Sequence, residues 1–155
     1  MTKTVATDFN IRMELRWGDY ETSWLLQEYL SEFYQLNQKQ PSADSKPTRG
    51  TKLRHLELSD ENAKIGGVNI QVFHDYVLID VLWVRPASRK KGFGRQLADE
   101  VERYAKSVGA KRILLSVFEH QNSLDFWKKF GCEEVGRIRD YPPGQQLIYL
   151  HKRIS

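Results

Sequence analysis

The chain has 155 residues, 40% of them hydrophobic and 12% aromatic, which fits one globular domain over residues 1–155. No apolar run approaches the roughly 18 residues of a membrane-spanning helix, and the N-terminus lacks the apolar core of a secretion signal, so we expect a cytoplasmic protein with no membrane partner. The formal charge of +4 suggests an anionic partner, and the single cysteine, Cys132, excludes an internal disulfide and offers no metal cluster.

The first third of the chain predicts a strand, a helix and a polar connection. Residues 9–17 alternate apolar and polar side chains, as a half-buried strand does. Asp19 can cap a helix that would cover one face of a sheet. The apolar positions of this helix are Trp24, Leu25, Tyr29, Leu30 and Phe33. Residues 37–50 are polar and rich in proline and serine, which predicts an exposed connection.

Three strands and a helix are predicted next. The strands cover residues 52–58, 64–73 and 76–84, and the last is rich in β-branched and aromatic side chains and too short to favour a helix. Apolar residues then recur at helical spacing, and Gly109 supplies a C-terminal stop. These apolar positions are Leu97, Val101, Tyr104, Ala105 and Val108.

The loop between residues 84 and 97 carries the most informative sequence, Arg-Lys-Lys-Gly-Phe-Gly-Arg at residues 89–95. Gly92 and Gly94 would let the backbone approach a ligand, with the free first-turn N–H groups of the helix facing an anion. The spacing does not match a Walker loop, and a dinucleotide-binding turn would need a third glycine and a start directly after its strand. A phosphate-binding loop and a solvated basic turn are the two interpretations left.

The last third predicts a strand at residues 112–118, a short helix within residues 123–132, and two strands at residues 134–141 and 146–153. The helix between the strands at residues 76–84 and 112–118 predicts that these two strands run parallel. The sequence Pro-Pro-Gly at residues 142–144 predicts the turn of a closing hairpin.

The pattern Arg/Gln-x-x-Gly-x-Gly/Ala at residues 89–94 resembles the pyrophosphate-binding signature of the GNAT superfamily of acyl-CoA-dependent N-acetyltransferases. Residues 123–132 resemble its second signature, and the resemblance covers roughly residues 51–155. It implies an α/β, GNAT-like fold with a mixed, mostly antiparallel sheet flanked by helices. It also implies direct transfer of an acetyl group from acetyl-CoA, without a metal, to a primary amine of a small molecule or peptide.

The resemblance assigns acetyl-CoA binding to the main chain at one strand end, to the basic loop and to two residues further on. These residues are Leu82, Trp83, Val84, Arg89, Lys90, Lys91, Gly92, Phe93, Gly94, Arg95, Asn122 and Trp127. Many family members have, at the position of Trp127, a tyrosine that protonates the departing sulfur. An indole N–H is not acidic enough for this step, which leaves Tyr141, Tyr149 and water as alternative donors.

Two residues are candidates for proton transfer. Strict alternation would put Asp80 on one strand face with Leu82 and Val84, where apolar surroundings would raise the pKa of its carboxyl towards that of a general base. The alternatives are a carboxylate that is hydrogen-bonded to a neighbouring strand and one that holds the substrate ammonium by charge. His120 could contact the cofactor arm or relay a proton, and the alternative is an exposed loop histidine.

Other functions are weighed against acetyl transfer. A domain without the usual acid could bind an acyl-CoA as a non-catalytic sensor or partner-binding module. Nucleic-acid binding is disfavoured because basic and acidic residues are interspersed outside the loop and no nucleic-acid-binding motif is present. Exposed strand edges are compatible with a homodimer.

Overall fold

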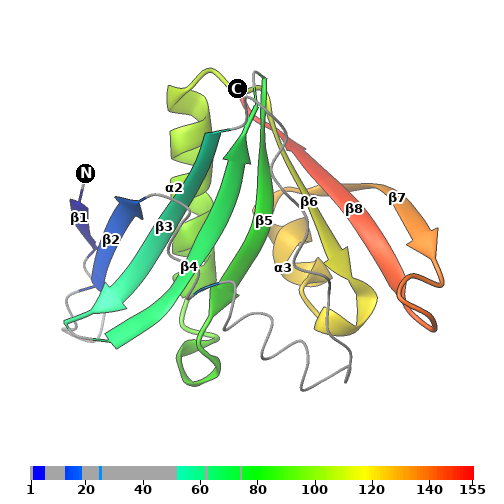
Figure 1. The fold of residues 1–155 in the computed structure, drawn as a ribbon, viewed down its shortest axis with the longest axis horizontal. Helices are drawn as coiled ribbons and strands as arrows, with labels where there is room; N and C mark the ends of the chain where they lie inside the picture. Colours follow the sequence, from blue (N-terminus) through cyan, green and yellow to red (C-terminus); the bar gives the residue numbers. More distant parts are fainter. Residues whose placement is uncertain (1, 6–12, 19–24, 26–51, 62, 74) are drawn as a thin grey trace.

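Within the residues that the structure describes, the fold is a twisted, eight-stranded sheet with α-helices packed against it (Figure 1). The computed structural model describes residues 2–5, 13–18, 25, 52–61, 63–73 and 75–155. The strands lie in the order β1-β2-β3-β4-β5-β6-β8-β7, and all neighbours are antiparallel except β5 and β6. The strands are β1 (Thr2–Val5), β2 (Met13–Gly18), β3 (Lys52–Asp60), β4 (Ala63–Val72), β5 (Tyr76–Val84), β6 (Arg112–Phe118), β7 (Glu133–Arg139) and β8 (Gln146–Arg153). The helices are α2 (Phe93–Ser107) and α3 (Leu124–Phe130), with 3-10 turns η1 (Pro86–Ser88) and η2 (Glu119–Gln121).

The mixed, mostly antiparallel sheet predicted from the sequence is confirmed. The predicted bounds of β5, β6 and β8 are correct. β3 is slightly longer than predicted, β4 has the predicted length but begins and ends one residue earlier, and β7 is slightly shorter. β1 was not predicted. The predicted helix after Asp19 and the polar connection lie outside the described residues, apart from Leu25, which is helical and fully buried.

The core lies between the sheet and the inner face of α2. Leu97, Val101 and Ala105 are fully buried there, because their spacing directs them to one side of the helix. Val108 was predicted to belong to this set, but its side chain is 41% exposed. The reason is that α2 ends at Ser107, one residue earlier, and Gly109 then takes a left-handed φ of +80°.

β5 is covered on both faces, which is typical of a strand with a parallel neighbour. Its residues Val77, Ile79 and Val84 belong to the main core with α2 and α3. On the opposite face, Val81 and Trp83 pack in a second cluster with Leu25. The continuous apolar sequence of this strand therefore reflects burial on both sides.

A β-bulge at Asp80 changes which residues of β5 share a face. Ile79 pairs with Ile70 of β4 whereas Val81 pairs with Asn69, so β5 has one extra residue at this point. The predicted strict alternation is therefore wrong. Asp80 lies on the face opposite Val84, because the bulge reverses the alternation between them.

The same region of β5 separates from β6. The parallel ladder joins Tyr76–Ile79 to Arg112–Leu115 and ends there, although both strands continue and are described throughout. Figure 1 shows the two strands diverging towards the end that leads into α2. From the bulge onwards the main chains of β5 and β6 are thus no longer paired, and we call this separation of the two backbones the wedge.

Candidate active site

Along the β5 side of the wedge, every second residue directs its main-chain N–H and C=O groups into it. Arg85 N–H donates to the Ile65 carbonyl at 2.7 Å, and the Trp83 carbonyl lies so close to Gly66 that any Cβ there would clash. Residues 83 and 85 therefore direct their main chain towards β4. Because neighbouring residues point in opposite directions, Leu82 and Val84 direct theirs into the wedge.

This register distinguishes Trp83 from Leu82 and Val84, the other two strand residues predicted to bind the cofactor. The main chain of Leu82 and Val84 is placed as the prediction requires. Trp83 differs, because its main chain faces β4 and its side chain belongs to the cluster around Leu25. The predicted main-chain contact from Trp83 therefore has no support in this geometry.

Arg89 turns back onto the end of β5. Its Nε donates to the Val84 carbonyl at 2.8 Å, and its guanidinium lies 6.0 Å from the Trp83 ring centroid. This side chain closes the turn after β5 and places a positive charge at the end of the wedge.

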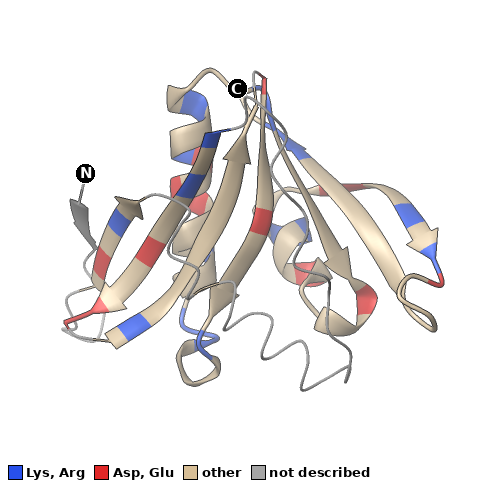
Figure 2. Ribbon diagram, viewed as in Figure 1, with Lys and Arg blue, Asp and Glu red and all other residues tan. Residues whose placement is uncertain are grey.

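The N-terminus of α2 has open donors. Gly92 is the N-cap residue, at φ +85° and without a side-chain cap, and the first intrahelical bond runs from Gln96 N–H to its carbonyl at 3.1 Å. The N–H groups of the first three helical residues consequently have no partner within the helix. A Cβ on Gly92 would meet no atom within 4 Å. The exposed Lys90 and Lys91 add positive charge to this loop, which Figure 2 shows in blue between β5 and α2. The arrangement is suited to binding an anion.

Gly94 also serves the packing of the two helices, and its predicted contact with the cofactor stays a prediction. A Cβ there would lie 3.3 Å from the Phe126 ring of α3 and 3.8 Å from the Leu82 side chain. Its missing side chain therefore allows α3 and the start of α2 to pack closely. Phe93, also assigned to cofactor binding, has its side chain buried in the core, so any contact it makes with an anion would come from its N–H.

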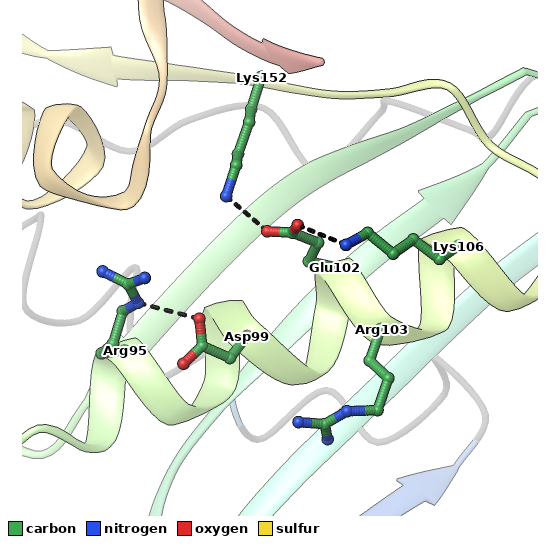
Figure 3. Close-up of a pocket in the computed structure, with 6 residues that line it drawn as sticks. All are labelled: Arg95, Asp99, Glu102, Arg103, Lys106 and Lys152. Carbon is green, nitrogen blue, oxygen red and sulfur yellow. Dashed lines mark hydrogen bonds and ion pairs between the residues drawn. The ribbon is translucent and has the colours of Figure 1, made fainter. Parts of the chain in front are cut away.

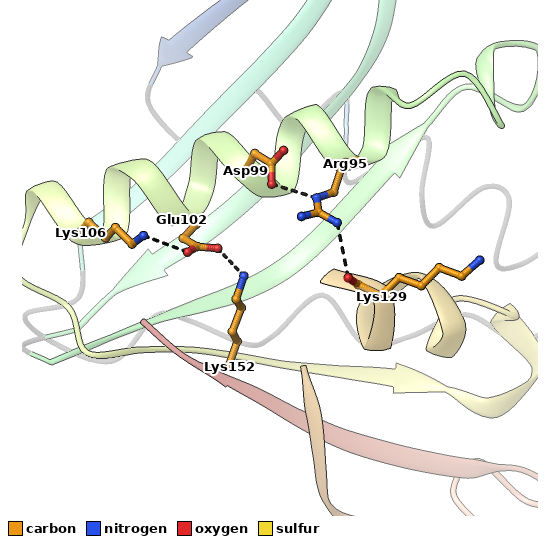
Figure 4. Close-up of polar contacts among 6 residues, drawn as sticks. All are labelled: Arg95, Asp99, Glu102, Lys106, Lys129 and Lys152. Carbon is orange, nitrogen blue, oxygen red and sulfur yellow. Dashed lines mark hydrogen bonds and ion pairs between the residues drawn. The ribbon is translucent and has the colours of Figure 1, made fainter. Parts of the chain in front are cut away.

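Arg95 joins the two helices. Its Nε donates to Asp99 at 2.9 Å, its Nη1 lies 3.4 Å from the Lys129 carbonyl (Figure 4), and its guanidinium covers the Phe130 ring at 5.3 Å. The predicted cluster of four basic side chains is thus divided. Arg89 and Arg95 are engaged with the protein, and Lys90 and Lys91 extend into solvent.

A depression on the outer face of α2 is lined by paired charges (Figure 3). Glu102 accepts from Lys152 of β8 at 2.5 Å and contacts Lys106 at 3.1 Å. Partial burial alone would raise the pKa of Glu102, but hydrogen bonds from the two lysines outweigh it and hold that pKa below its usual value. The lining residues are Arg95, Asp99, Glu102, Arg103, Lys106 and Lys152. Arg95 pairs with Asp99 within this set, whereas Arg103 pairs with Glu100 outside it. The contact between Glu102 and Lys152 ties α2 to β8.

Asp80 is exposed, and its two carboxylate oxygens lie 2.8 and 2.9 Å from the Gln71 amide nitrogen. The predicted apolar surroundings are therefore wrong for this residue, because the bulge places Leu82 and Val84 on the other face of β5. The alternative of a carboxylate hydrogen-bonded to a neighbouring strand is confirmed. Its action as a general base stays a prediction.

His120 lies in η2, beyond the end of β6. Its ring is half-buried and stacks on Phe118 with 5.8 Å between centroids, so the alternative of an exposed loop histidine is wrong. Asn122 follows in a left-handed conformation at φ +53° and is exposed. Both residues follow the strand that forms the other side of the wedge. Their predicted roles remain predictions.

The Trp127 side chain is only 4% exposed and belongs to the main core. Its ring meets Phe126 at 4.9 Å and Phe130 at 5.9 Å, both edge to face. Packing within the protein accounts for this position, and a cofactor contact from Trp127 stays a prediction. Among the alternative acids, Tyr149 is 42% exposed on β8 opposite Ser116, and Tyr141 is 54% exposed.

Gln71 is the residue that sequence reasoning missed. Its position in a strand is evident from the sequence, but its contact with Asp80 depends on the register of β4 against β5. Among the described residues, no group of His, Cys, Asp or Glu is arranged to hold a metal ion. The helices of the described part are also too short or too polar to cross a membrane.

Comparisons with known proteins agree with this geometry. The model of the acetyltransferase (GNAT) family matches residues 12–132. An acetyltransferase structure from Bacillus cereus is 32% identical, covers 83% of this chain and 91% of its own, and has a TM-score of 0.64.

Two more distant structures share the fold. The ribosomal-protein-S18-alanine N-acetyltransferase from Escherichia coli has a TM-score of 0.69 at 19% identity, over 91% of this chain and 94% of its own. An aminoglycoside 6'-N-acetyltransferase complexed with coenzyme A has a TM-score of 0.67 at 17% identity, over 90% and 97%. No curated protein sequence matches this chain. The family model, which spans most of the chain, shows that this protein belongs to the GNAT family of acetyltransferases.

Proposed function

We propose that the protein transfers the acetyl group of acetyl-CoA to a primary amine of a small molecule or peptide. The observation that carries this proposal is the wedge between β5 and β6, where their pairing ends on the strand that leads to the uncapped N-terminus of α2. The coenzyme A in the related aminoglycoside acetyltransferase supports the same ligand here.

The chain offers suitable groups for each part of this substrate. The open N–H groups after Gly92, with Lys90 and Lys91, would hold the pyrophosphate. The main chain of Leu82 and Val84 would pair with the amide-containing arm as an added strand. An N–H of this strand end would also polarise the thioester carbonyl. Acetyl-CoA supplies the activated acetyl group.

The acceptor amine must lose a proton to attack. Asp80 is exposed on the sheet face opposite α2, at the point where the wedge begins, and in this proposal it accepts that proton. The amine nitrogen then forms a bond to the carbonyl carbon, the carbon–sulfur bond breaks, and the thiolate receives a proton from Tyr149 or water. Tyr149 is the more suitable tyrosine because the pairing of β6 with β8 puts it next to Ser116, one residue beyond the last β5–β6 pair.

A second function is favoured by one observation. The residue at the position of the usual acid is a buried indole, Trp127, which cannot protonate a thiolate. A protein without a substitute acid would bind acyl-CoA as a sensor or partner-binding module.

Release of free thiol from acetyl-CoA, measured with a panel of amines and peptides, distinguishes the two functions. We expect an amine-dependent release and an acetylated product detectable by mass spectrometry. An Asp80→Asn variant should bind acetyl-CoA as the wild type does but turn over at least about tenfold more slowly, since general-base catalysis typically contributes 10² to 10⁴. Calorimetric binding of acetyl-CoA without turnover on any amine would favour the sensor. Absence of binding to folded protein would refute both.

A further inference from the structure

We propose that Gln71 is a positioning residue that holds the Asp80 carboxylate in place to accept the proton of the acceptor amine. This inference rests on the proposed acetyl transfer. It assigns a function to a residue of β4 that has no part in the nucleotide-binding loop.

The register of β4 and β5 creates the contact. Gln71 is paired with Leu78, and Asp80, two residues further along β5, lies on the same face of the sheet as this pair, directly beside the bulge. The Gln71 amide nitrogen then lies 2.8 Å from one carboxylate oxygen and 2.9 Å from the other. Since an ionised carboxylate only accepts hydrogen bonds, the nitrogen of the amide must be the atom that faces it.

The contact restricts the orientation of the carboxylate. One amide nitrogen lies within hydrogen-bonding distance of both Asp80 oxygens, so it holds the plane of the carboxylate in a defined position relative to β4.

Gln71 and Asp80 lie at the part of the fold where the proposed reaction takes place. The bulge follows Ile79, which forms the last pair with Leu115 of β6, so Asp80 lies where the wedge opens. Gln71 lies on the opposite side, in β4, and is half-buried. It can therefore hold Asp80 from behind while the side towards the wedge receives the amine.

The test compares Gln71→Leu and Gln71→Glu with the wild type, each also in an Asp80→Asn background. Gln71→Leu removes the donor at similar size, and we expect kcat/KM for the amine to fall about tenfold, the loss typical of a hydrogen bond to a charged group. The acidic limb of its pH–rate profile should move to higher pH, and further still in Gln71→Glu, which puts two carboxylates together. Calorimetric affinity for acetyl-CoA should stay unchanged.

A matched control is Gln146→Leu. Gln146 also donates to a carboxylate, that of Glu119, but at 3.4 Å and from β8. The Gln146→Leu variant should leave the pH–rate profile unchanged.

The double variants decide whether Gln71 acts through Asp80. In the Asp80→Asn background, Gln71→Leu should cause no further loss, because residues that act as a unit are not additive. A wild-type profile in Gln71→Leu, or an equal further loss in the double variant, would overturn the proposal while acetyl transfer stands. If the wild type releases no thiol with any amine, the proposed function itself fails.

Discussion

Two glycines at opposite ends of α2 allow a test that distinguishes two effects of replacing Gly92. One is the loss of anion binding, and the other is the loss of stability from a side chain in a left-handed conformation. Gly92 has φ +85° and Gly109 has φ +80°, and a Cβ on either would meet no atom within 4 Å. Replacing either with alanine imposes a left-handed conformation on a residue with a side chain, at a cost of about 1–2 kcal/mol. For a domain of this size, each kcal/mol lowers Tm by about 2–4 °C.

The two variants should differ in ligand binding. The Cβ of Gly92→Ala would occupy the open space beside the first-turn N–H groups and weaken at least one hydrogen bond to a phosphate. A hydrogen bond to a charged group contributes about 1.5–3 kcal/mol, which corresponds to a loss of about 10- to 100-fold in affinity. Gly109→Ala should bind acetyl-CoA as the wild type does, because it lies at the far end of the helix.

Thermal unfolding and calorimetric titration with acetyl-CoA measure both effects. Similar losses of Tm with a loss of affinity in Gly92→Ala alone would support the phosphate loop. If both variants are equally destabilised and both keep wild-type affinity, the anion does not bind at Gly92 and the reasoning is refuted.

Three further predictions concern other parts of the molecule. Glu102→Gln should lose about 1 kcal/mol of stability near neutral pH, from its half-buried contact with Lys152. Because the folded-state pKa of Glu102 is lowered, this stabilisation is present above its unfolded pKa and is lost as pH falls through the folded value, so denaturant curves of variant and wild type should converge in acid. Cys132 is buried, and burial raises the pKa of its thiol to about 11. We expect slow reaction with a thiol reagent at pH 8 until denaturant is added, and fast reaction in native protein would contradict this burial. Tyr149→Phe should lower kcat without changing acetyl-CoA affinity if Tyr149 replaces the acid missing at Trp127, and an unchanged kcat would leave water as the donor.

The sequence by itself determined the strands and helices around the wedge. β5 and β6 were predicted with their observed ends, because a run of β-branched and aromatic residues between turn signals is a local property. The parallel direction of these strands followed from the helix between them. Gly92 at a helix entrance was also evident, because a glycine directly before an amphipathic segment is a local signal, and its left-handed φ is one that glycine adopts without a Cβ clash.

Only the tertiary structure decided how side chains use these elements. The bulge at Asp80 depends on pairing with β4 and reversed the predicted alternation of β5, and the register of these two strands produced the contact between Asp80 and Gln71. Gly94 serves the packing of α3, and Arg95 reaches Lys129, contacts that join residues more than 30 positions apart. Local sequence sets the backbone preferences of a segment, whereas strand register and helix contacts are set by distant segments meeting in space.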